Sequence, residues 1–130
     1  MSLKEIFVKS CVHLLKFYEL YPYHYKLYLR INYEIDAPNY KELRRYLVKY
    51  VSAITHQFIE IGKNRLLLRD DINSDLAIFF INSFLNRFIE VCFVPGVEPI
   101  INYNIISSHK METIEEIYKL LIEGLGTKNG

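Results

Sequence analysis

Polar side chains interrupt the apolar stripe of the first predicted helix, and such residues are candidates for binding a ligand. Ser10 and His13 share a face with Ile6 and Phe17. Burying a polar group without a hydrogen-bond partner costs about 1–3 kcal/mol. Each buried group is therefore expected to meet another polar group, water or a ligand.

The same pattern recurs on two further predicted helices. Tyr50 and Gln57 lie on the apolar stripe of the third helix, and Asn82 lies at the edge of the apolar face of the fourth. Ligand sites are mostly apolar with a few convergent polar groups. The pattern predicts one shared pocket, and the alternative is internal pairing of these groups. The candidate lining residues are His13, Phe17, Tyr50, Gln57 and Asn82.

Catalytic and metal-binding patterns are missing from the sequence. The four histidines include no pair at i, i+4 spacing, and there is no G-x-S-x-G, phosphate-binding glycine loop or H-E-x-x-H. Cys11 and His13 are close in sequence but project in different directions from a helix. Cys11 and Cys92 are far apart and match no metal or redox spacing. We expect free thiols, no enzymatic activity, no metal and no cofactor.

Local signals divide the first half of the chain into three helices. Apolar periodicity predicts a helix over residues 3–21, and Pro22 suits the first turn of a second helix that ends before Ala37. Asn39 reads as the N-cap of a third helix, with Glu42 as its capping-box partner. Gly62 then supplies the left-handed stop expected after a helix.

Two more helices are predicted in the second half. Asp70 and Asp71 are suited to begin the fourth, where carboxylates favour the positive end of the helix dipole. Residues 95–108 are apolar but irregular, and their conformation stays open. A last helix is capped by Ser108 or by a capping box that begins at Thr113. We therefore predict an all-α fold of about five helices, with residues 1–130 forming a single-domain bundle.

Composition limits the classes of function. The net charge of +1 leaves no electrostatic footprint for nucleic acid. Charged residues interrupt the N-terminal apolar residues, so no signal segment is visible. The longest uninterrupted apolar run, residues 76–81, is too short to cross a bilayer. We expect a cytoplasmic protein without a membrane partner.

The fourth and last predicted helices carry more apolar surface than one core requires. On each, apolar residues cover more than half of the circumference. A surface helix needs a narrower stripe, so the surplus implies a partner or burial under residues 95–108. We predict a homodimer that uses these two helices. The candidate interface residues are Phe84, Phe88, Ile114, Ile117, Tyr118 and Leu121.

One segment and its neighbours carry a resemblance to a known family. The turn at Gly62 is followed by Leu-Arg-Asp at residues 68–70 and then by a long apolar helix, and the final helix ends in Gly124-Leu125. Together with the aromatic–proline pair Tyr21-Pro22, this order resembles the C-terminal regulatory domain of TetR-family transcriptional repressors. The resemblance covers nearly the whole chain. The N-terminal helix-turn-helix of that family is absent from these residues.

The resemblance implies a function that the residues alone do not specify. It implies a TetR-like effector-binding and homodimerisation domain, with a hydrophobic or aromatic small molecule as effector. Two helices from each subunit would form a four-helix bundle, and DNA would be contacted only through the absent N-terminal domain. The alternative is a stand-alone helical protein-interaction module without a small-molecule site.

Overall fold

The computed structural model describes residues 1–34, 36, 38–93 and 110–127, and for Asn32, Leu47, Val48, Tyr50 and Val51 it describes the backbone alone. The regular elements in these residues are all helices, which confirms the all-α prediction. A single isolated bridge joins Leu68 to Gly126. The helices are α1 (Leu3–Leu20), α2 (Pro22–Tyr33), α3 (Tyr40–Asn64), α4 (Ser74–Phe93) and α6 (Lys110–Leu125).

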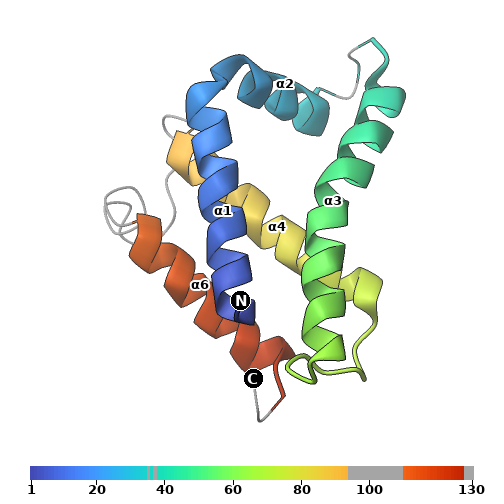
Figure 1. The fold of residues 1–130 in the computed structure, drawn as a ribbon. Helices are drawn as coiled ribbons and strands as arrows, with labels where there is room; N and C mark the ends of the chain where they lie inside the picture. Colours follow the sequence, from blue (N-terminus) through green and yellow to red (C-terminus); the bar gives the residue numbers. More distant parts are fainter. Residues whose placement is uncertain (35, 37, 94–109, 128–130) are drawn as a thin grey trace.

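Helix α1 is the centre of the arrangement (Figure 1). It packs against α6 on one side and against α3 on the other, and α2 contacts both α1 and α3 at one end of the molecule. Helix α4 packs mainly on α3 and crosses behind α1 in the view of Figure 1. One hydrophobic core extends through all five helices and includes Leu68 of the α3–α4 loop.

The core face of α1 differs from the predicted face. The buried side chains recur every three or four residues, as a helix with one inward stripe requires. They are Leu3, Phe7, Cys11, Leu15 and Tyr18. Phe17, which we expected to face inward, is exposed. Apolar residues surround much of this helix, so periodicity alone did not select the stripe that meets α3 and α6.

The buried face of α3 also differs from the predicted face. Its buried residues in the C-terminal half are Thr55, Phe58, Ile59 and Gly62. Gln57, which belongs to the predicted stripe, is exposed. The helix begins at Tyr40 as expected, but Asn39 adopts a left-handed conformation (φ 60°) and its side chain makes no capping hydrogen bond, so the predicted capping box is wrong.

Gly62 does not end α3, because the helix continues to Asn64. The residue with a left-handed backbone is Leu66, at φ 60°. Gly62 serves another purpose: a Cβ there would lie 2.4 Å from Cδ1 of Leu68. The missing side chain therefore lets the α3–α4 loop fold back onto the helix.

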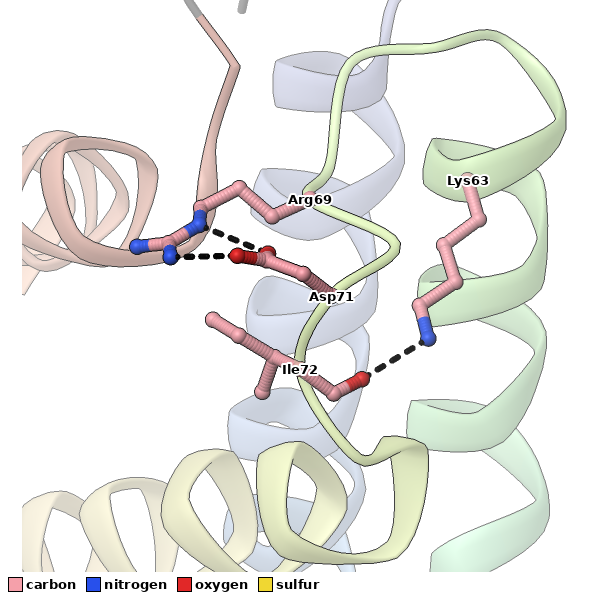
Figure 2. Close-up of polar contacts among 4 residues, drawn as sticks. All are labelled: Lys63, Arg69, Asp71 and Ile72. Atoms are coloured by element: carbon pink, nitrogen blue, oxygen red, sulfur yellow. Dashed lines mark hydrogen bonds and ion pairs between the residues drawn. The ribbon is translucent and has the colours of Figure 1, made fainter.

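Helix α4 begins later than the acidic pair suggested. The side-chain Oδ1 of Asn73 accepts a hydrogen bond from the backbone N–H of Leu76 at 3.1 Å, which is the geometry of an N-cap. Asp70 and Asp71 lie before this cap. Asp71 instead accepts two hydrogen bonds from Arg69, at 3.0 and 2.8 Å (Figure 2).

Lys63 ties the end of α3 to the start of α4. Its Nζ donates to the carbonyl of Ile72 at 3.1 Å, as Figure 2 shows, and to Oγ of Ser74 at 2.7 Å. Both acceptors belong to the approach to α4. The ammonium group therefore fixes the distance between the two helices that the loop joins.

The segments that carry the family resemblance meet in space. The backbone N–H of Arg69 donates to the carbonyl of Leu125 at 2.8 Å, and that of Thr127 donates to the carbonyl of Leu67 at 3.0 Å. The α3–α4 loop and the end of α6 are thus joined by backbone hydrogen bonds. Helix α6 itself begins at Lys110, so Thr113 lies within the helix and does not cap it. Ser108 and the open segment 95–108 lie outside the described residues.

Candidate functional site

The structure does not gather the predicted pocket residues around one cavity. His13 and Gln57 are exposed on α1 and α3. Phe17 is also exposed and makes ring contacts with Tyr21 and His24, at centroid distances of 5.1 and 5.5 Å. The predicted site therefore needs correction at these three residues. They lie outside the inward stripes because α1 and α3 turn other faces to the core. The side chain of Tyr50 lies outside the described parts of the chain.

Asn82 is half-buried and pairs internally. Oγ1 of the buried Thr55 donates to its Oδ1 at 2.5 Å, and its Nδ2 donates to Oγ of Ser52 at 3.3 Å. These contacts join α3 to α4 within the core. For Asn82, the alternative of internal pairing is what the structure shows.

A groove lies between α2 and the C-terminal half of α4. Its volume is about 610 Å³, and it is open to solvent. We call it the α2–α4 groove. It is lined by Lys26, Leu29, Arg30, Tyr33, Glu34, Arg87 and Glu90.

Glu90 is the most unusual residue of the groove, because its carboxylate is almost fully buried. The residue is 7% exposed. The hydroxyl of Tyr33 donates to Oε1, and Nη1 of Arg87 donates to Oε2 at 3.2 Å. Buried carboxylates require such partners. The hydrogen bond to Glu90, together with burial and the charge of Glu90, raises the pKa of Tyr33.

A layer of aromatic side chains lies beside the groove, between α1, α2 and the end of α4. Tyr18 packs edge-on against Tyr25 at 5.1 Å, and Tyr25 contacts Phe93 at 5.2 Å. The hydroxyl of Tyr28 donates to Oδ1 of Asn86. Burial is the main cause that raises the pKa of Tyr25 and Tyr28. The Tyr25 hydroxyl is buried without a hydrogen-bond partner among the described residues.

The candidate interface residues divide into two groups. Phe84 is exposed on α4. The other five belong to the core of the chain itself, so the interface predicted from them needs correction: Phe88, Ile114, Ile117, Tyr118 and Leu121. Their apolar arcs are wide because one chain uses most of that surface internally.

Helix α4 nevertheless keeps an exposed apolar face. Leu76 (63% exposed), Phe79 (68%), Phe80 (49%) and Phe84 (39%) follow i, i+3, i+4, i+8 spacing, which places them on one side of the helix. We call these four residues the α4 stripe. By length and composition alone, with a mean hydropathy of 1.5, α4 is apolar enough to cross a membrane. Core helices of soluble proteins share that composition, so it is weak evidence for a membrane span.

The described residues contain no group of three or more His, Cys, Asp or Glu side chains positioned to hold a metal ion. Cys11 and Cys92 are free thiols. Burial raises the pKa of the Cys11 thiol to about 12. A thiol of that pKa is protonated at neutral pH, and its nucleophilicity is low.

The groove residues were not identified from the sequence. In the sequence, Arg87 and Glu90 belong to the polar stripe that remains beside the wide apolar face of the fourth helix. One signal was available: Glu90 stands within the otherwise apolar run from Phe88 to Phe93. A carboxylate in such a run needs a partner, and the structure supplies Tyr33 from another helix.

Comparisons of the chain with protein-family models, with curated proteins and with solved structures give no match.

Proposed function

We propose that this chain is the effector-binding and homodimerisation domain of a TetR-like transcriptional regulator. In this function it binds an apolar small molecule, and the binding controls the DNA affinity of a helix-turn-helix domain supplied outside these 130 residues. The all-α architecture supports the proposal. So does the junction between the α3–α4 loop and the end of α6, the two segments that carry the family resemblance.

The observation that carries the proposal is that α4 borders both a cavity and an exposed apolar surface. Its N-terminal turns present the α4 stripe, and its C-terminal turns form one wall of the α2–α4 groove. Arg87 lines the groove and follows Phe84 by three residues, so the two features adjoin on one helix. A four-residue apolar stripe exposed to water favours association with a second apolar surface.

The arrangement supports a simple means of control. A ligand in the groove contacts α2 and α4, and a movement of α4 would carry the α4 stripe with it. If the ligand binds one arrangement of the dimer more tightly, it shifts the population toward that arrangement. The separation of the attached DNA-binding domains then changes.

Light scattering on purified protein tests the dimer. At micromolar concentration the measured mass should be twice the 15.5 kDa of one chain. Phe80→Asp and Phe84→Asp should shift it toward monomer, because each variant places a charge in the apolar contact. Tyr23→Asp is the matched control, since Tyr23 is an exposed aromatic residue on α2 outside the α4 stripe. A monomeric unmodified chain would overturn the dimer.

The stand-alone protein-interaction module remains the second candidate, and the pairing of Asn82 with Thr55 and Ser52 favours it. In that case the polar groups of the helices are satisfied internally, and the α4 stripe binds a different protein. Light scattering would then show a monomer, and the groove would bind no small molecule.

A further inference from the structure

The α2–α4 groove contains more cationic than anionic side chains. Lys26, Arg30 and Arg87 line it together with only two carboxylates, those of Glu34 and Glu90. Glu34 accepts a hydrogen bond from Nε of Arg30 at 3.0 Å, and Glu90 accepts one from Nη1 of Arg87 at 3.2 Å. Each carboxylate is thus neutralised within the groove, and the charge of Lys26 is left in excess.

Lys26 is available to a ligand. Its Nζ lies 5.5 Å from the centroid of the Tyr23 ring, and no carboxylate of the described residues forms an ion pair with it. A cation–π contact at an exposed site is weak. The ammonium group therefore retains the capacity to donate to a stronger acceptor.

Hydrogen-bond donors in the groove also exceed acceptors. A guanidinium group has five N–H donors. Arg30 uses its Nε and Arg87 its Nη1 in the contacts with the two carboxylates. The carboxylate of Glu90 already accepts from Tyr33 and Arg87. An anionic ligand finds unused N–H donors on both guanidinium groups and on Lys26.

The two uncharged residues that line the groove are Leu29 and Tyr33. Half-buried Leu29 lies in its wall, and the carbon stems of Lys26 and Arg30 add to a lining that consists mainly of carbon. The volume of about 610 Å³ is within the range of pockets that hold small organic ligands. The site thus combines an apolar wall with a cationic rim.

We propose that the α2–α4 groove binds a monocarboxylate with an apolar body. The carboxylate lies against Lys26, Arg30 and Arg87, and the apolar body lies along Leu29. This inference rests on the proposed function and specifies the chemical class of its effector.

A titration followed by amide NMR tests the inference with three probes of equal chain length: octanoate, 1-octanol and octylammonium. Octanoate should shift amide signals of α2 and of the C-terminal half of α4. It should bind on the order of tenfold more tightly than 1-octanol, because only octanoate accepts charge-assisted hydrogen bonds. Octylammonium should bind most weakly.

Two variants locate the carboxylate. Lys26→Met and Arg30→Met keep a long apolar side chain but remove the charge, and each should weaken octanoate binding on the order of tenfold while leaving 1-octanol binding unchanged. Lys4→Met is the matched control, because Lys4 is an exposed lysine near the N-terminus, at the opposite end of the molecule from α2 (Figure 1). Circular dichroism on each variant verifies that the helices are retained.

The outcomes separate this inference from the proposed function. If 1-octanol or octylammonium binds in the groove as tightly as octanoate, or if neither variant weakens octanoate binding, the monocarboxylate inference is overturned and a small-molecule site remains. If none of the three probes shifts the groove signals, the inference and the effector part of the proposed function both fail. The dimer is measured independently by light scattering.

Discussion

Gly62 and Leu68 are packed so closely that a Cβ at Gly62 would lie 2.4 Å from Cδ1 and 2.5 Å from Cγ of Leu68. Leu68 is buried in the core, and its backbone also bridges to Gly126 near the end of α6. A leucine held by these two constraints has little freedom to move away. The close approach of Leu68 therefore favours a residue without a side chain at position 62.

Gly62→Ala should accordingly destabilise the protein, even though alanine is the better helix former. Overpacking costs about 1–3 kcal/mol, and the gain in helix propensity offsets about 1 kcal/mol of it. We expect a net loss of up to about 2 kcal/mol in the free energy of unfolding, measured by urea denaturation. Gly124→Ala is the control, because a Cβ there meets nothing within 4 Å, and it should raise stability by up to about 1 kcal/mol. Equal effects of the two substitutions would refute this packing argument.

Asn82→Ala should destabilise the contact between α3 and α4. The change leaves the buried hydroxyl of Thr55 without its acceptor, which costs about 1–3 kcal/mol. Thr55→Val completes a double-mutant cycle. Because the two side chains are in direct contact, the cycle should show a coupling energy of about 0.5–3 kcal/mol. Additive effects would show that the hydrogen bond contributes nothing to stability.

Stability should fall as the pH rises above about 9, and Cys11 should account for part of the slope. Burial raises the pKa of its thiol from 9.0 to about 12, so the folded state disfavours the thiolate. The unfolded chain releases this proton first, and stability is lost from about pH 9 until the folded pKa near 12 is reached. The maximal slope for one proton is about 1.4 kcal/mol per pH unit. Burial likewise raises the pKa of Tyr18 to about 12.

Urea denaturation across this alkaline range measures the slope. Cys11→Ala should lower the baseline stability, because it removes a buried side chain, but it should flatten the dependence on pH. The comparison uses slopes and not absolute values. If the free energy of unfolding falls equally steeply with pH in Cys11→Ala and in the unmodified protein, the assignment to Cys11 is contradicted.

Lys63→Met should loosen the approach to α4. Methionine keeps most of the unbranched side chain but cannot donate to the carbonyl of Ile72 or to Oγ of Ser74. We expect a loss of about 1–2 kcal/mol in the free energy of unfolding and faster hydrogen exchange in residues 66–74. Lys119→Met is the control, because the contact that Lys119 makes among the described residues is an exposed ion pair with Glu116. If the amide hydrogens of residues 66–74 exchange equally fast in both variants, the hydrogen bonds of Lys63 do not hold the loop.

The helices were predictable where the signals are local. The aromatic–proline step at Tyr21-Pro22 separates α1 from α2 as expected, and α4 ends at Phe93 just before the proline–glycine pair. A proline restricts its own backbone and that of the residue before it, whatever the tertiary fold. Such signals therefore act without knowledge of the neighbours.

The inward faces were not predictable in the same way. Helix α1 has apolar residues on nearly every side, and only the positions of α3 and α6 select the stripe of Phe7 and Cys11 over that of Phe17. The groove depends even more on distant residues, since Tyr33 and Glu90 are 57 positions apart. A pattern read along one helix contains no information about such a partner.

The contact between the rings of Phe7 and Tyr118, at 5.6 Å, makes the first helix depend on the last. During synthesis on the ribosome α1 emerges before α6, the helix that covers part of its surface. Until residue 127 has left the ribosomal exit tunnel, Phe7 and its apolar neighbours therefore stay exposed and can associate with other apolar segments. We expect a cellular chaperone that holds exposed apolar segments to bind the growing chain throughout that interval.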